Sequence, residues 1–283
     1  MAFKTLISTD VLAANLADPW FAIVDCRFRL DDVTWGEREW KAGHIPGAPY
    51  AHLDRDLSGR KSGTNGRHPL PDVAALAETF GRLAVTSGVQ VVAYDQDNGM
   101  FASRLWWLLR WLGHDAVAVL DGGFAKWIAE GRPTSIGDER HEPRNFRAAL
   151  RPDMAIDVNQ VEAHAGDRGW SLVDARAPER YRGESEPLDR VAGHIPGATN
   201  HFFQWNLDER GTFRTPEELR ARFRADIIVP ERVVCYCGSG VTACHNLLAL
   251  EHAGVSGAKL YPGSWSEWSS DPARPVEVKI ERC

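Results

Sequence analysis

Residues 43–48 read Gly-His-Ile-Pro-Gly-Ala, and the same six residues stand unchanged at 193–198. Three further blocks recur in the same order: VDCR (24–27) as VDAR (173–176), VVAYD (91–95) as VVCYC (233–237), and LDGGFAKW (120–127) as LYPGSWSEW (260–268). The displacement between partners is roughly 140–150 residues, which is the length of one domain. The sequence therefore predicts two copies of one domain.

Each copy alternates strand and helix signals. In the second copy, the apolar runs at 171–174 and 232–236 predict buried strands, and 215–225 and 242–252 predict helices. The first copy matches it with predicted helices at 71–83 and 99–112. This alternation is typical of an α/β fold whose mostly parallel sheet carries helices on both faces. We expect domains at 1–137 and 153–283, joined by a charged linker at 138–152 that contains two prolines.

Composition narrows the class of protein. The 283 residues are 43% hydrophobic and 25% charged, and the formal net charge is −6. A general nucleic-acid binder needs a basic excess, so that class is disfavoured. The N-terminus has no signal-peptide core, and no stretch approaches the ~20 apolar residues that cross a bilayer. We expect a cytoplasmic monomer that binds neither nucleic acid nor membrane.

The five cysteines stand at 26, 235, 237, 244 and 283. An odd, low number argues against a secreted disulfide scaffold. Cys235, Cys237 and Cys244 lie close together and His245 follows, so we considered zinc. Structural zinc sites pair a C-x2-4-C hairpin with a second ligand pair, which this spacing lacks. Reduced thiols, with no metal and no cofactor, are the better interpretation.

The two copies differ most after the strand that ends in Val-Val-x-Tyr. The first copy continues as DQDNG (95–99), and the second as CGSGVTA (237–243). Ligands bind at the carboxyl ends of parallel strands, and glycines allow successive N–H groups to converge on one point. A helix starting near Thr242 adds its N-terminus, so the nest favours a nucleophilic thiolate or a persulfide anion. We expect Cys237 to be catalytic and Cys235 and Cys244 to be inert. The predicted active-site loop comprises Gly238, Ser239, Gly240, Val241, Thr242 and Ala243.

These motifs support a family resemblance. The CGSGVTA loop, the duplicated GHIPGA and the closing Gly-x-Trp-x-Glu-Trp resemble the tandem rhodanese-family sulfurtransferases, in particular the 3-mercaptopyruvate and thiosulfate group, from Val11 to about Val276. The resemblance implies two rhodanese-like domains, the first inactive with Asp95 in place of the cysteine. It also implies a ping-pong cycle in which Cys237 takes sulfur from a small anionic donor. The persulfide then passes it to cyanide, a thiol or a thioredoxin-like acceptor.

The resemblance also implies roles around Cys237. A neutral loop is typical of mercaptopyruvate enzymes, where Ser239 would polarise or protonate near the leaving group, with His44 as the candidate partner from the first domain. Arg180 matches the family's substrate arginine, and a bidentate guanidinium suits a carboxylate. In the first copy, Asp31 takes the place of Arg180. Where the family carries a second substrate arginine, this chain has Asp189. Arg190 beside it is the candidate to bind substrate in its place if the loop shifts by one residue, and thiosulfate stays open as the donor.

Three other interpretations were weighed. A phosphatase of the same fold needs an arginine six residues beyond the cysteine, and Ala243 stands there. A non-enzymatic binding module describes the first domain, but the intact cysteine loop speaks against it for the whole chain. A sulfur relay to a protein acceptor would use the same persulfide, so the sequence leaves it open.

Overall fold

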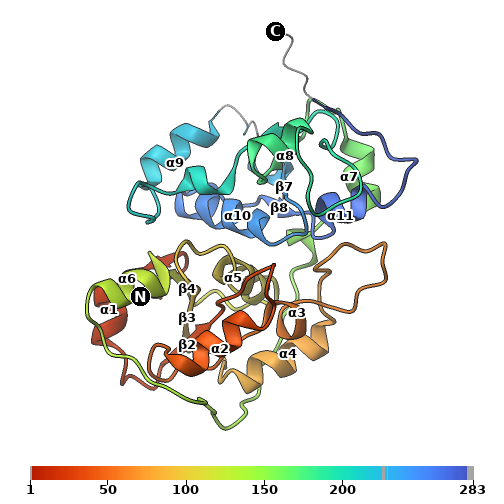
Figure 1. The fold of residues 1–283 in the computed structure, drawn as a ribbon. Coiled ribbons are helices and arrows are strands. Elements are labelled where there is room, and N and C mark those ends of the chain that lie inside the picture. The colour runs from red at the N-terminus through yellow and green to blue at the C-terminus, as the bar shows by residue number, and fades with distance from the viewer. Residues whose placement is uncertain (1, 225–226, 228, 279–283) are drawn as a thin grey trace. The chain divides into compact units, whose positions relative to one another are not determined.

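The computed structural model describes residues 2–224, 227 and 229–278, and these fall into two compact units (Figure 1). Unit 1 holds the chain up to Gly59, Leu70–Arg151 and Glu209–Phe213. Unit 2 holds Arg60–Pro69, Pro152–Asp208 and the described residues from Arg214 onward. In the described residues, no helix is long and apolar enough to span a membrane.

Unit 1 is an α/β layer structure with four parallel strands in the order β1-β4-β3-β2. Its elements are β1 (Leu6–Ile7), α1 (Thr9–Ala14), β2 (Phe21–Asp25), α2 (Trp35–Ala42), α3 (Leu53–Asp56), α4 (Val73–Arg82), β3 (Gln90–Tyr94), α5 (Ala102–Trp111), β4 (Val117–Leu120) and α6 (Gly123–Ala129).

Unit 2 repeats the plan with four parallel strands in the order β6-β5-β7-β8. Its helices and strands are α7 (Val158–His164), β5 (Ser171–Asp174), α8 (Pro178–Arg182), β6 (Thr199–Asn200), α9 (Pro216–Phe223), β7 (Val233–Tyr236), α10 (Thr242–His252), β8 (Lys259–Leu260) and α11 (Ser264–Trp268). Three short 3-10 turns complete it: η1 (Pro152–Met154), η2 (Phe203–Asn206) and η3 (Pro230–Arg232).

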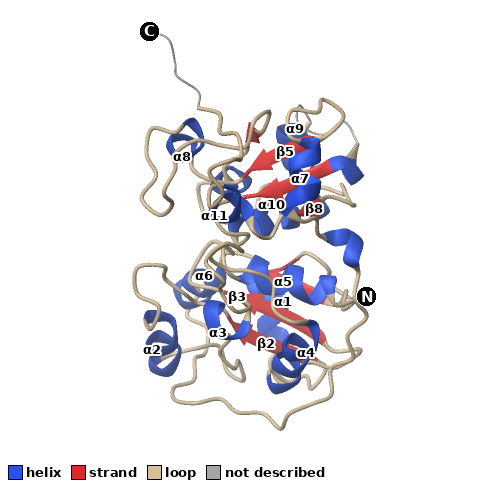
Figure 2. Cartoon of the chain, turned by 90° about the vertical axis from the view of Figure 1, so that its right-hand side faces the viewer, coloured by secondary structure: helices blue, strands red, loops and turns tan. Residues whose placement is uncertain are grey.

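Helices cover both faces of each sheet, which Figure 2 shows for the two units. Side chains alternate along a strand, so Val234 and Tyr236 of β7 share one face and pack with Trp265 and Trp268 of α11. Helix α10 packs against β7 and β8 and also contacts α9. The strands are buried along most of their length, as the apolar runs predict for a covered parallel sheet. The predicted fold class is confirmed.

The two GHIPGA turns are built alike. The Nδ1 atom of His44 lies 2.7 Å from the Trp40 carbonyl oxygen, and Nδ1 of His194 lies 2.7 Å from that of Tyr181. Each histidine is fully buried and stacks on the ring of the residue whose carbonyl it contacts. The shared motif therefore fixes a turn in both units.

The boundaries differ from the expected ones in three places. The segment expected as a linker, 138–152, packs along unit 1: Phe146 is buried against Phe80, and the Ala149 N–H donates to the Leu112 carbonyl. Residues 60–69 belong to unit 2, although the sequence places them in the first copy. The reciprocal loop of the second copy, 209–213, belongs to unit 1. The periodicity of strand and helix residues does not indicate which unit the segments 60–69 and 209–213 pack against.

Helix limits also shift slightly. Helix α5 begins at Ala102 instead of residue 99, because the loop after β3 first turns through Gly99 at a φ of 80°. Helix α9 covers Pro216–Phe223 with Thr215 as a capping box, and Ala225, the predicted end, lies outside the described residues. Helix α10 has the predicted limits.

Candidate active site

Cys237 directly follows strand β7, and 2% of its surface is exposed. The Gly240 N–H donates to its Sγ atom at 3.1 Å, and helix α10 begins two residues later at Thr242. The Cys237 N–H donates to Ser264 Oγ at 3.1 Å. The sulfur thus lies beside a backbone N–H group and close in sequence to the start of a helix.

The closing tryptophan motif forms the support of this loop. The backbone N–H of Trp265 in α11 donates to the Cys237 carbonyl oxygen at 2.9 Å. Gly240 has a φ of 77°, and a Cβ there would lie 2.3 Å from the Pro262 carbonyl oxygen. Glycine is required at this position by both the backbone angle and the close approach. The loop is therefore fixed before any ligand arrives.

Unit 1 provides a built-in comparison for this nest. Asp95 occupies the place of Cys237, and its carboxylate accepts N–H bonds from Asp97, Gly99, Phe101 and Ala102 at 2.7–3.3 Å. Burial raises the pKa of Asp95 to about 6, against the lowering effect of the Ala102, Gly99 and Phe101 N–H groups. The loop architecture accepts an anionic group, and in unit 1 the chain's own carboxylate fills it.

Ser239 projects toward the residues that unit 2 takes from the first copy. Its Oγ lies 2.7 Å from Nδ1 of His68, and both side chains are buried. The segment 60–69 is anchored there by the Arg67 N–H, which donates to Ser266 Oγ at 3.0 Å. A serine and a histidine in contact beside a cysteine can move a proton.

The histidine expected beside Ser239 was His44, and the structure assigns that position to His68 instead. Both ring nitrogens of His44 are engaged within unit 1, by the Trp40 carbonyl and, at 3.4 Å, by Glu139. The ring of His44 thus holds its own turn, and the ring in contact with Ser239 is that of His68. The expectation for His44 is corrected on this ground.

Arg180 lies on helix α8 and is held by Glu186. Its Nε and Nη2 atoms donate to the two Glu186 oxygens at 3.2 and 2.6 Å. Glu186 also accepts from Arg176 and from the backbone N–H of Asp189 at 3.2 Å in both cases. Arg176, which pairs with Asp174 as Arg27 pairs with Asp25, belongs to the framework. The Arg180 side chain is 18% exposed, so it stays accessible.

Arg190 follows Asp189 in the loop after α8. It is exposed and lines a cavity of about 370 Å³ together with Lys61, Arg67 and Asp189. A Cβ added to Gly238 would lie 2.9 Å from Nη2 of Arg67 and 3.4 Å from Nη2 of Arg180. The guanidinium groups of Arg67 and Arg180 are the groups nearest to this position.

The remaining cysteines fit framework roles. Burial raises the pKa of Cys235 well above its ordinary value, and Cys244 Sγ contacts the Gly240 carbonyl oxygen at 3.4 Å. Cys26 is also buried, and burial again raises its pKa. Cys283 lies outside the described residues. The residues that can be described contain no group of three or more His, Cys, Asp or Glu side chains arranged to hold a metal.

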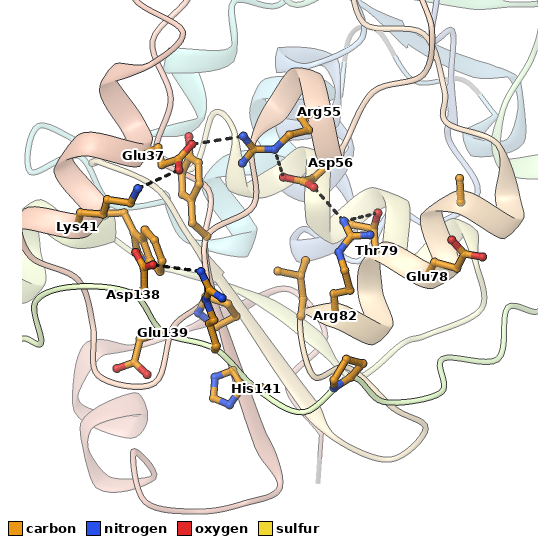
Figure 3. Close-up of a pocket in the computed structure, with 17 residues that line it drawn as sticks. Glu37, Lys41, Arg55, Asp56, Glu78, Thr79, Arg82, Asp138, Glu139 and His141 are labelled. Carbon is orange, nitrogen blue, oxygen red and sulfur yellow. Dashed lines mark hydrogen bonds and ion pairs between the residues drawn. The ribbon is translucent and has the colours of Figure 1, made fainter.

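A cavity of about 780 Å³ lies in unit 1, lined by residues of α2, α3, α4 and 138–143 (Figure 3). Glu37 pairs with Lys41 and Arg55, and Asp56 pairs with Arg55 and Arg82. Its charged groups thus neutralise one another. We assign no activity to this cavity.

Sequence reasoning missed Arg67 and His68. A signal was present, because the segment 60–69 (RKSGTNGRHP) has no match in the second copy, and residues found in one copy alone point to chemistry. Cys237 and Arg180 were predicted as functional because the other copy lacks them, and the basic segment 60–69 meets the same condition. Its place in unit 2 is a tertiary feature that spacing does not encode.

Comparison with known proteins identifies the family. The model of the rhodanese-like domain family matches residues 8–130 and 157–271. A Pseudomonas aeruginosa protein named "Probable 3-mercaptopyruvate sulfurtransferase" is 47% identical over 98% of this chain and 99% of its own. Human 3-mercaptopyruvate sulfurtransferase is 40% identical over 89% of this chain and 88% of its own. Thiosulfate sulfurtransferase of Cricetulus griseus is 34% identical over 99% and 96%.

Among solved structures, SseA from Escherichia coli, described as a 3-mercaptopyruvate sulfotransferase, superposes with a TM-score of 0.79 at 33% identity. The match covers 93% of this chain and 99% of that one. Two family matches in one chain and full-length relatives of this similarity lead to one conclusion. The chain belongs to the rhodanese-like family of sulfurtransferases.

Proposed function

We propose that this protein transfers sulfur from 3-mercaptopyruvate to cyanide or a thiol, with a persulfide on Cys237 as the intermediate. The contact between Ser239 and His68 is the observation that favours 3-mercaptopyruvate over thiosulfate as the donor. Loss of sulfur from 3-mercaptopyruvate leaves an enolate of pyruvate, which must gain a proton. Loss of sulfur from thiosulfate leaves sulfite, which does not need one. A proton-transferring pair beside the cysteine suits the first reaction.

In the first half-reaction, the Cys237 thiolate attacks the donor sulfur. A sulfur–sulfur bond forms, the carbon–sulfur bond breaks, and its electron pair passes to the pyruvate enolate. Ser239 is placed to donate a hydrogen bond to the enolate, and the proton that yields pyruvate comes through the Ser239–His68 pair. The products are pyruvate and Cys237 persulfide.

In the second half-reaction, the acceptor attacks the outer sulfur and the Cys237 thiolate leaves. Until then the persulfide needs stabilisation for its terminal charge. Aligning Gly240 with Gly99 sets the N–H groups of Thr242 and Ala243 at the places of Phe101 and Ala102, which hold the Asp95 carboxylate in unit 1. We infer that these amides stabilise the outer sulfur.

Arg180 is the proposed partner of the donor carboxylate. Its guanidinium is oriented by Glu186 and comes within 3.5 Å of a Cβ position on Gly238, next to Cys237. A planar guanidinium pairs with a carboxylate through two parallel hydrogen bonds. This fixes the donor with its sulfur toward the cysteine.

A location in a reducing compartment, in line with the cytoplasmic expectation, belongs to the same proposal. The cycle needs Cys237 as a thiolate, and the four described cysteines are free. The monomeric state is also proposed, because Cys237, Ser239, His68 and Arg180 all come from one unit of one chain. A thioredoxin-like protein is the expected thiol acceptor in that compartment.

The direct test is donor preference. We expect kcat/KM for 3-mercaptopyruvate to exceed that for thiosulfate at least about tenfold, because proton transfer helps only the first leaving group. Pyruvate and sulfite release would be measured in parallel with cyanide as acceptor. Faster turnover of thiosulfate would contradict the proposal and identify thiosulfate as the preferred donor. Persulfide formation without turnover by cyanide or small thiols would favour a relay to a protein.

A second prediction concerns Arg180. Arg180→Ala should raise KM for 3-mercaptopyruvate about 30- to 100-fold, because losing a bidentate partner in a partly buried site costs ~2–3 kcal/mol. Arg182→Ala is the matched control, since Arg182 lies on the same helix and pairs with the exposed Glu184. Equal KM values in the two variants would remove Arg180 from the donor site.

A further inference from the structure

Two guanidinium groups converge over the loop that carries Cys237. Measured from a Cβ position on Gly238, Nη2 of Arg67 lies at 2.9 Å and Nη1 and Nη2 of Arg180 lie at 3.5 and 3.4 Å. The two arginines come from distant parts of the sequence, the segment 60–69 and helix α8, yet both belong to unit 2. Both guanidinium groups therefore border the position that a donor held at Cys237 would occupy.

The chain's own carboxylate already bridges this pair. Asp189 accepts a hydrogen bond from Nη1 of Arg67 through one oxygen, and its other oxygen lies 3.5 Å from Nη2 of Arg180. Its side chain is only 6% exposed, whereas that of Arg67 is 29% exposed. One carboxylate shared by two guanidinium groups is the arrangement in which a bound carboxylate ligand would also be held.

Asp189 and Glu186 differ in how firmly they are held. Glu186 accepts from Arg176 and from the backbone N–H groups of Leu188 and Asp189, in addition to Arg180. It belongs to the framework that fixes the loop. Among the described residues, the side chains that bind the Asp189 carboxylate are those of Arg67 and Arg180. Of the two acidic groups, Asp189 is the one that a ligand can replace without dismantling the loop.

The electrostatic balance agrees with an exchangeable role. Burial raises the pKa of Asp189, and the neighbouring Glu186 adds to the rise, while Arg67 and Arg180 lower it. The ionised carboxylate thus pays a desolvation cost that its partners do not fully offset. A donor that brings its own carboxylate to the same two guanidinium groups competes on favourable terms.

We propose that Arg67 and Arg180 together bind the carboxylate of the donor, and that Asp189 occupies the same pair until the donor displaces it. This inference rests on the proposed function, because it assumes a carboxylate donor at Cys237. Arg67, from the segment 60–69, then acts as the second substrate-binding arginine beside Arg180. The position where the sequence leads us to expect that arginine holds Asp189 instead. Asp189 sets donor affinity by competing for the pair.

Steady-state kinetics test both halves of the proposal. Arg67→Gln should raise KM for 3-mercaptopyruvate about tenfold or more, because one of two charge-assisted partners is lost. Asp189→Asn should lower KM about fivefold with kcat retained, because an uncharged amide competes less well for the guanidinium groups. Lys61→Ala is the control, since Lys61 is exposed on the same segment as Arg67 and should leave KM unchanged.

Pyruvate binding separates this inference from the proposed reaction. Calorimetric titration of pyruvate into the full chain needs no sulfur transfer, so it reports on carboxylate binding even if the donor is a different one. We expect the Kd of pyruvate to fall in Asp189→Asn and to rise in Arg67→Gln. Unchanged pyruvate binding in both variants would overturn the proposal, as would weaker binding in Asp189→Asn. A rise in KM for Arg190→Ala with none for Arg67→Gln would overturn it in favour of Arg190.

Discussion

Cys237→Ser is expected to abolish sulfur transfer from any donor while leaving the fold unchanged. The hydroxyl has nearly the size of the thiol, and the loop around it is fixed by Gly240 and by the Trp265 N–H. A serine oxygen does not form a persulfide, so the covalent intermediate is lost. Mass spectrometry after incubation with donor should show the gain of one sulfur atom in the wild type and none in the variant.

Cys235→Ala provides the matched control, since Cys235 lies two residues away in the same strand and is completely buried. It should keep sulfur transfer and lose some stability, because a buried sulfur is replaced by a smaller group. If Cys237→Ser retained more than a few per cent of wild-type activity, Cys237 would not be the sulfur carrier. Circular dichroism and thermal unfolding of each variant would establish that the fold is intact.

The fold could be read from the sequence because it rests on local and repeated signals. Buried parallel strands are short apolar runs in the sequence. The start of helix α9 is indicated by Thr215 as its N-cap and by Pro216 as its first residue. Because the sequence contains two copies of the domain, each strand and helix could be predicted from either copy. Comparing the copies also separated shared framework residues, such as His194, from residues found in one copy alone, such as Cys237.

The environment of Cys237 was only partly predictable. The loop itself is contiguous, so its glycines and the start of α10 indicate an anion nest directly. His68 and Arg67 reach it through the folded position of the segment 60–69, which has neither helix nor strand periodicity. His44 was chosen by its motif, but the motif needs that histidine for its own turn. Side chains brought in by irregular segments are specified by tertiary packing.

Asp95 shows how little change separates the two loops. The same nest that receives the Cys237 sulfur is filled in unit 1 by a carboxylate that accepts four backbone N–H bonds. An acid at that position satisfies the N–H groups permanently. A cysteine leaves part of the nest for the outer sulfur of a persulfide. The loop of unit 1 therefore supports the chemistry proposed for unit 2.

Ser239→Ala should lower kcat for 3-mercaptopyruvate about 10²- to 10³-fold, because general acid catalysis contributes on that order. The buried Ser239 Oγ contacts Nδ1 of His68 at 2.7 Å, so His68→Ala should act in the same direction. The double variant should lose little more than either single one, because the two groups act as a unit. Initial rates of pyruvate release would measure all three.

Thiosulfate supplies the control within the same proteins. Sulfite leaves without a proton, so kcat for thiosulfate should fall far less than kcat for 3-mercaptopyruvate in both single variants. A misplaced Cys237 would slow both donors alike, whereas loss of proton transfer slows only the donor that forms an enolate. Equal losses with the two donors would therefore assign Ser239 and His68 to holding the loop, and additive losses in the double variant would show that they do not act together.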